Sequence, residues 1–100
     1  MFKTYGIYWR YDVDDEIDPE IRLPTLRGRF QRHVYRGEDG TENTCGWLVE
    51  RRRAEIGAYR DLVESGISDT AEIAKRDCEA ALLRHLTAHE KIALAKKALR

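Results

Sequence analysis

The sequence has no long hydrophobic run and few cysteines. No apolar stretch approaches the roughly 20 residues that a membrane-spanning helix needs, and the amino terminus lacks the apolar core of a signal peptide. Cys45 and Cys78 are the only two cysteines in 100 residues, too few for the disulfide framework of a small secreted protein. We therefore expect a cytoplasmic protein that does not contact membranes and keeps both thiols reduced.

Motifs of the common enzyme classes are also missing. The chain contains no GxGxxG, no Walker loop, no GxSxG and no HExxH. His85 and His89 have the spacing of two zincin ligands, but the glutamate that activates water is absent. Cys78 lies about two helical turns from His85, too far for comfortable chelation of one ion. We expect a protein that is not an enzyme and holds neither a metal nor a cofactor.

Net charge is a third absence, because 18 basic residues balance 18 acidic ones. The whole molecule should therefore have no general attraction to nucleic acid or anionic lipid. The distribution is uneven, however. Residues 1–20 hold six acids and two bases, whereas residues 21–60 hold five acids and nine bases. This segregation favours local charged surfaces.

The clearest pattern that is present covers Lys3–Val13. Its apolar residues occupy every second position: Tyr5, Ile7, Trp9, Tyr11 and Val13. Side chains alternate between the two faces of a strand, and aromatic and β-branched residues favour strands. The spacing predicts an N-terminal strand with one aromatic face. The polar stretch that follows, residues 14–24, is predicted to be an exposed loop.

A hairpin is predicted next. Alternation returns over Arg29–Arg36 and Thr44–Glu50, and the intervening Gly37–Gly40 is a turn signal. We expect a connection longer than a tight two-residue turn. An alternative begins a helix at Gly46, but the alternation around Trp47 favours the strand.

The remaining half is predicted to be helical. Arg51–Ser65 carries apolar residues at i, i+3, i+6 and i+7: Ile56, Tyr59, Leu62 and Val63. Gly66 is placed to end that helix as its C′ residue. Asp69 with Glu72 is a candidate capping pair for the next one.

Residues 70–99 contain neither glycine nor proline. They predict either one long helix or two helices divided at Leu86 by a capping box of Thr87 and Glu90. Leu83 and Leu94 form a second apolar strip, which favours contact with another chain and a possible homodimer through the helices. The predicted fold is thus a single α+β domain over 1–100. A small antiparallel sheet of about three strands (1–50) precedes two or three helices (51–100).

The acidic run after the first strand is the preferred candidate for partner binding. Closely spaced carboxylates can occupy a basic groove on another protein, and electrostatic complementarity gives such contacts speed and specificity. Trp9 and Tyr11 precede the run and would be its apolar anchors. The predicted partner-binding carboxylates are Asp14, Asp15, Glu16 and Asp18.

The arginine-rich hairpin supports an alternative, nucleic-acid binding. Cations mixed with aromatic residues on one face can hold phosphates and stack bases. The candidate residues are Arg27, Arg29, Arg32, Arg36, Arg51, Arg52 and Arg53.

The preferred hypothesis is a non-catalytic interaction protein. A concrete version is a phage or mobile-element inhibitor or adaptor that binds a bacterial nucleic-acid-handling protein complex through its acidic loop.

Overall fold

The computed structural model describes the backbone of residues 2–11, 19–37 and 40–99, and their side chains outside residues 32–43. Its elements are the 3-10 helix η1 (Phe2–Tyr5), strands β1 (Glu20–Arg22), β2 (Leu26–Gly37), β3 (Gly40–Arg53) and β4 (Ala58–Ser68), and helices α1 (Ala71–His85) and α2 (Ala88–Ala98). The strands form one four-stranded antiparallel sheet in the order β1-β2-β3-β4. The predicted α+β class is confirmed.

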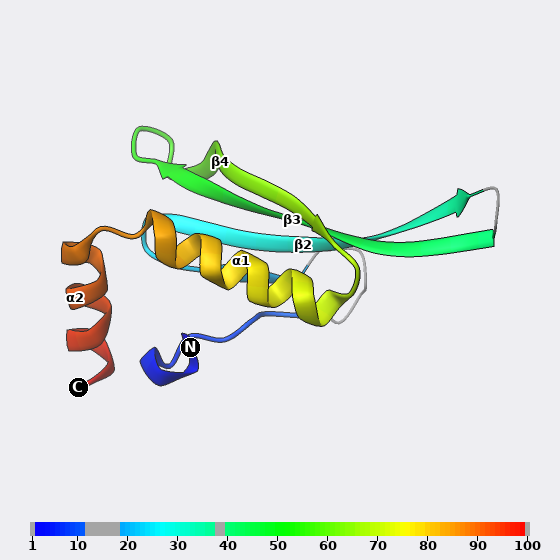
Figure 1. The fold of residues 1–100 in the computed structure, drawn as a ribbon. Coiled ribbons are helices and arrows are strands. Elements are labelled where there is room, and N and C mark those ends of the chain that lie inside the picture. The colour runs from blue at the N-terminus through cyan, green and yellow to red at the C-terminus, as the bar shows by residue number, and fades with distance from the viewer. Residues whose placement is uncertain (1, 12–18, 38–39, 100) are drawn as a thin grey trace.

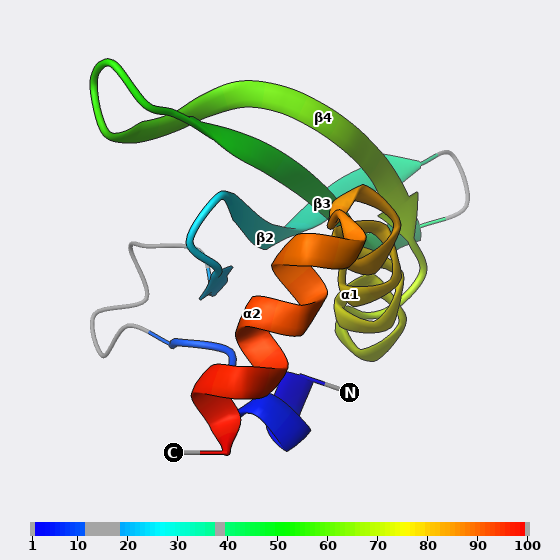
Figure 2. The same ribbon diagram turned by 90° about the vertical axis from the view of Figure 1, so that its left-hand side faces the viewer.

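The helices all lie on one side of the sheet. α1 runs across β2 and β3 (Figures 1 and 2). At the carboxyl end of α1 the chain turns, and α2 extends toward η1. No described element covers the opposite side, which we call the open face. The molecule is therefore a two-layer domain with one face of its sheet in solvent.

The core lies between the sheet and α1. Alternate residues of the central strands point toward the helix, as the pleat requires. The buried apolar residues from the strands include Leu26, Phe30, Cys45, Trp47 and Val49, and those from α1 are Ala74, Cys78, Ala81 and Leu82. At Gly28, a Cβ atom would lie only 2.6 Å from Cys78 Sγ. The missing side chain lets α1 pack directly against the backbone of β2.

The predicted hairpin is confirmed and is longer than expected. Leu26 pairs with Arg51 at one end, and Gly37 pairs with Gly40 at the other. Only two residues lie between those glycines, so the prediction of a longer connection is wrong. Trp47 is on a strand, as the alternation favoured.

The predicted N-terminal strand is wrong. The chain begins with η1 and then turns at Gly6, whose φ of +70° is in the region that favours glycine. Beyond the turn the segment is extended, but it pairs with the sheet only through the isolated bridge between Arg10 and Glu20. The apolar face still exists, because Tyr5, Ile7 and Trp9 pack against the core. Val13 lies outside the described residues.

The predicted helix over Arg51–Ser65 is also wrong, because β3 continues to Arg53 and β4 begins at Ala58. The cause is a pair of β-bulges. β4 advances two residues while β3 advances one, both at Val49/Glu50 and at Arg51/Arg52. Tyr59, Leu62 and Ser65 share the open face and are therefore spaced three apart, which mimics a helical repeat. Beyond the bulges the ordinary spacing of two returns at Ile67.

Gly66 does not end a helix. It pairs with Trp47 across the sheet, where a Cβ atom would lie 2.6 Å from the indole ring. Glycine at this position therefore makes room for a buried tryptophan on the adjacent strand.

The division of residues 70–99 into two helices is confirmed. Thr87 Oγ1 accepts from the Glu90 backbone N–H at 3.1 Å, and Glu90 Oε1 accepts from the Thr87 N–H at 3.2 Å. The N-cap of α1 is Thr70, one residue beyond the expected Asp69. Leu83 is partly buried against the core and Leu94 is buried, so packing within this chain accounts for both residues. Self-association through the helices stays a prediction from the sequence.

Candidate functional site

A groove lies between the N-terminal segment and α1, on the helical side of the sheet. Its volume is about 450 Å³. We call it the aromatic groove, and its lining residues are Lys3, Ile7, Tyr8, Trp9, Tyr11, Glu72, Lys75, Arg76 and Glu79. It contains both predicted apolar anchors, Trp9 and Tyr11, although the segment that carries them is not the predicted strand.

Trp9 lines this groove and packs against the core. Its ring meets Phe30 edge to face, with centroids 5.2 Å apart and planes at 71°. Its indole Nε1 is buried and has no hydrogen-bond partner among the described residues. An unpaired buried donor costs about 1–3 kcal/mol. The packing of Trp9 therefore outweighs the loss of a hydrogen bond.

The two tyrosines of the groove face solvent. Tyr8 is 59% exposed and Tyr11 is 56% exposed, so neither ring contributes much to the core. Lys75 Nζ lies 4.9 Å from the centre of the Tyr11 ring and 5.7 Å from that of Phe30. Tyr11 also raises the pKa of Lys75 above its ordinary value through a hydrogen bond. The groove thus holds the Lys75 ammonium beside two aromatic rings.

The predicted acidic residues are not placed. Asp14, Asp15, Glu16 and Asp18 lie outside the described residues. Their part in binding remains a prediction from the sequence.

The predicted nucleic-acid-binding arginines do not form one surface among the described side chains. Arg27 and Arg29 are on the open face, whereas Arg51 donates to the His85 carbonyl in α1, on the helical side. Arg52 donates to the Gly57 carbonyl, and Arg53 pairs with Asp61 at 2.5 Å. Arg32 and Arg36 are in β2, but their side chains lie outside the described set.

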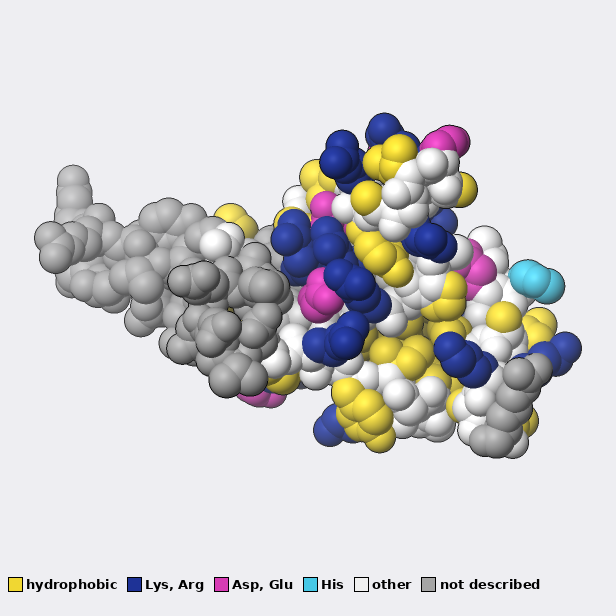
Figure 3. Space-filling view, turned by 180° about the vertical axis from the view of Figure 1, so that it is seen from behind, with side chains coloured by type: hydrophobic (Ala, Val, Ile, Leu, Met, Phe, Trp, Pro, Cys, Tyr) yellow, Lys and Arg dark blue, Asp and Glu magenta, His cyan; other side chains and the backbone are white. Residues whose placement is uncertain are grey.

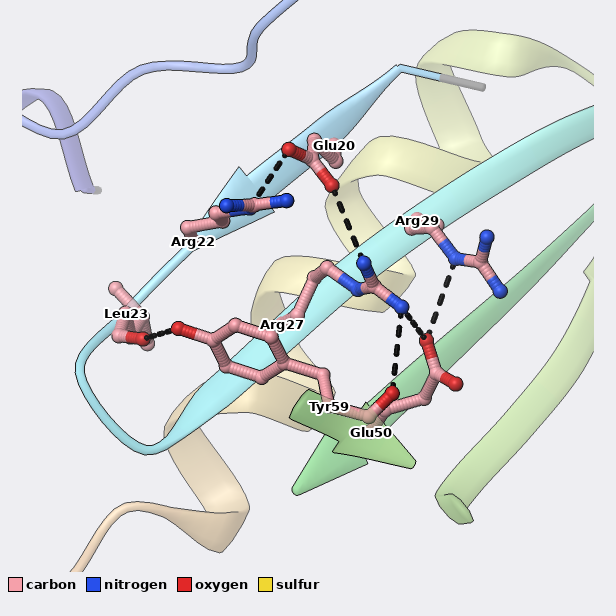
Figure 4. Close-up of polar contacts among 7 residues, drawn as sticks. All are labelled: Glu20, Arg22, Leu23, Arg27, Arg29, Glu50 and Tyr59. Carbon is pink, nitrogen blue, oxygen red and sulfur yellow. Dashed lines mark hydrogen bonds and ion pairs between the residues drawn. The ribbon is translucent and has the colours of Figure 1, made fainter. Parts of the chain in front are cut away.

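Arg27 and Arg29 belong to a network on the open face (Figure 4). Glu50 Oε1 lies 2.8 Å from Arg27 Nη2 and 3.3 Å from Arg29 Nε. Glu20 binds Arg22 at 2.8 Å and lies 3.6 Å from Arg27. The arginines are thus held by two glutamates from β1 and β3, and part of their charge is neutralised within the fold.

Tyr59 completes this network. Its hydroxyl donates to the Leu23 carbonyl at 2.6 Å, and its ring lies 5.3 Å from the Arg27 guanidinium and 5.8 Å from that of Arg22. This role is not predicted from the sequence, because the local spacing places Tyr59 on a helix. Only recognition of β4 as a strand would have placed the tyrosine beside the arginines.

The cysteines and histidines are not brought together as a reactive site. Cys45 and Cys78 are buried in the core, and burial raises the pKa of the Cys78 thiol to about 12. His85 contacts Glu64 at 3.0 Å, and His89 is exposed on α2. Within residues 2–11, 19–37 and 40–99, no three histidine, cysteine or acidic side chains are grouped as a metal site would require.

Fold and site together define a small α+β domain with a mixed aromatic and charged groove on its helical side. Comparison of the chain with protein-family models, curated proteins and solved structures gives no match. None of the described helices is long and apolar enough to cross a membrane.

Proposed function

We propose that this chain is a non-catalytic protein-binding domain whose partner docks in the aromatic groove. The observation that carries the proposal is the exposure of Tyr8 and Tyr11, both above one half, beside Trp9. Tyrosine, tryptophan and arginine are the residues most enriched at the energetic centres of protein interfaces. The groove contains all three types, since Arg76 also lines it.

The charge of the lining favours a protein partner over a small molecule. Small-molecule sites are predominantly apolar with a few polar groups. Here five of the nine lining residues are charged, three basic and two acidic. A partner with several side chains can pair with charges of both signs, and a small apolar ligand would leave them unpaired.

Nucleic-acid binding has less support as the main function. The described arginines divide between the two sides of the sheet, and Arg27 is held by both glutamates of the network. The adaptor or inhibitor role, the contribution of the acidic run and a cytoplasmic setting remain predictions from the sequence.

Site-specific photocrosslinking tests the proposal. Benzoylphenylalanine replaces Tyr8 in one version of the protein and Ile56 in the control. Ile56 is similarly exposed, at 53%, but it lies in the turn between β3 and β4, away from the groove. We expect a discrete adduct in cells from position 8 that Tyr11→Ala and Lys75→Gln each weaken. Equal adducts from both positions, or none from position 8, would contradict the proposal.

A further inference from the structure

The open face carries exposed aliphatic side chains. Leu62 is 64% exposed and Ile67 is 72% exposed, and both are on β4, with their side chains on the side away from α1. Figure 3 views the molecule from this side and shows basic side chains gathered beside hydrophobic ones. Large aliphatic side chains in solvent beside a charged cluster are typical of an interaction surface.

A shallow hollow of about 350 Å³ lies in this face. Gly46 leaves a gap in β3 where other residues would carry a side chain. Gln31 pairs with Gly46 across the sheet, and Arg29, Leu48 and Leu62 also line the hollow. The lining residues are Arg29, Phe30, Gln31, Gly46, Trp47, Leu48, Leu62 and Ser65.

The charge that faces solvent beside this hollow is positive. The side chains of Glu20 and Glu50 are only 15% and 14% exposed, whereas those of Arg22 and Arg29 are 49% and 32% exposed. The glutamates are therefore less accessible than Arg22 and Arg29, and Arg27, at 17%, is about as buried as the glutamates. A ligand that approaches this face meets guanidinium groups first, so charge complementarity requires an anionic ligand.

Arg29 has unused hydrogen-bonding capacity. Its Nε is buried and lies 3.3 Å from Glu50 Oε1 as an ion pair without a hydrogen bond, and its two terminal nitrogens have no hydrogen bond within the described part of the chain (Figure 4). A guanidinium edge of this kind matches a carboxylate or phosphate with two parallel hydrogen bonds. The ion pair with Glu50 leaves this edge without a partner among the described residues, and Arg29 lines the hollow.

The residues near Arg29 indicate whether the anionic ligand is a nucleic acid or a protein. Single-stranded nucleic acid is held by aromatic rings that stack with its bases. Tyr59 is the aromatic residue of the network, and its hydroxyl is bonded to Leu23 while two guanidinium groups lie against its ring. Leu48, Leu62 and Ile67 instead favour aliphatic side chains, which nucleic acids lack.

The edge of β4 does not favour addition of a partner strand. Two β-bulges interrupt its register with β3, and bulges at edges hinder pairing with further strands. A partner is therefore expected to use side chains on the open face and not its backbone at the edge.

We infer that the open face is a second docking surface, for a protein segment that presents carboxylates and aliphatic side chains on the same face. One carboxylate binds the terminal nitrogens of Arg29, and an adjacent aliphatic side chain enters the hollow beside Leu48 and Leu62. This surface is on the opposite side of the sheet from the aromatic groove, so the two interactions are independent.

Titration followed by ¹⁵N NMR tests the inference. The probes are a short peptide in which leucine and glutamate occupy every second position in turn with serine between them, the same peptide with glutamine in place of glutamate, and a single-stranded oligothymidine. We expect the glutamate peptide to shift the amide signals of Gly46, Leu48 and Leu62. Arg29→Gln should weaken this binding about tenfold, because it removes the hydrogen bonds between the guanidinium group and the glutamate carboxylate.

Two further variants keep the test independent of folding. Leu62→Ser changes a side chain that is already 64% exposed, and it should weaken the peptide while the spectrum stays folded. Lys96→Gln removes the same charge as Arg29→Gln from the exposed surface of α2 and should leave binding unchanged. Equal binding of the glutamine peptide, no shifts at the open face, or tighter Arg29-dependent binding of oligothymidine would each overturn the inference.

Discussion

Gly28 offers a quantitative test of how α1 sits on the sheet. An alanine Cβ there would lie 2.6 Å from Cys78 Sγ and 3.0 Å from Leu82 Cδ1. Overpacking of this kind costs about 1–3 kcal/mol, and the lower entropy of the unfolded chain returns about 0.4–1 kcal/mol. We therefore expect Gly28→Ala to lower the free energy of unfolding by about 1–2 kcal/mol.

The same contact predicts coupling between two substitutions. Cys78→Ala removes the nearest clashing atom and should alone cost about 1 kcal/mol, for lost apolar burial and a small cavity. In the double variant the new methyl group of residue 28 can fill the space vacated by the sulfur. The loss of unfolding free energy in the double variant should therefore be about 1 kcal/mol smaller than the sum of the losses in the two single variants.

Urea unfolding of the four proteins, followed by circular dichroism, measures this coupling. Cys45→Ala is the matched control, because Cys45 is also buried but is not among the atoms nearest to Gly28. Its combination with Gly28→Ala should be additive. Additive losses for Gly28→Ala with Cys78→Ala, or no loss from Gly28→Ala alone, would refute the close approach of α1 to β2.

Four further substitutions test other contacts of the fold and its self-association. Hydrogen bonds from Arg84 and His85 lower the pKa of Glu64 in the folded protein. The ionised carboxylate should therefore stabilise the fold at pH values above its ordinary pKa of 4.5, and this stabilisation should be lost as the pH falls through the lower pKa of the folded state. We expect Glu64→Gln to make the free energy of unfolding in urea depend less on pH between pH 7 and acidic pH. Thr87→Ala should destabilise α2 by about 1 kcal/mol, seen as faster amide exchange there than in α1. Trp9→Phe removes an unpaired N–H and should keep the thermal midpoint within about 5 °C. If self-association uses the helices, Ile92→Glu should lower the sedimentation coefficient; an unchanged value would exclude Ile92, which is 54% exposed, from that interface.

The N-terminal segment shows how far a local pattern reaches. Its alternation correctly placed Ile7 and Trp9 toward the core, because a period of two describes any extended chain against a surface. Tyr5 also packs against the core, but from η1. It did not determine pairing, which depends on a partner elsewhere in the sequence. Gly6 turns the chain, and the only bridge of the described segment with the sheet is at Arg10.

β4 shows the opposite failure. Its two bulges placed open-face residues three apart, and the sequence contains no local sign that distinguishes this spacing from a helix. The arginine–glutamate network could not be predicted either, because Glu20, Glu50 and Tyr59 come from three separate strands.

The sequence by itself determined the features whose causes are local. These are the hairpin around Trp47, the capping box of Thr87 and Glu90, the two-helix carboxyl end and the α+β class. Each depends on residues close together in the chain. Tertiary structure decided which extended segments pair, which face of the sheet α1 covers and which arginines remain in solvent. Those outcomes depend on hydrogen bonds and packing between distant residues, and they produced both the aromatic groove and the open face.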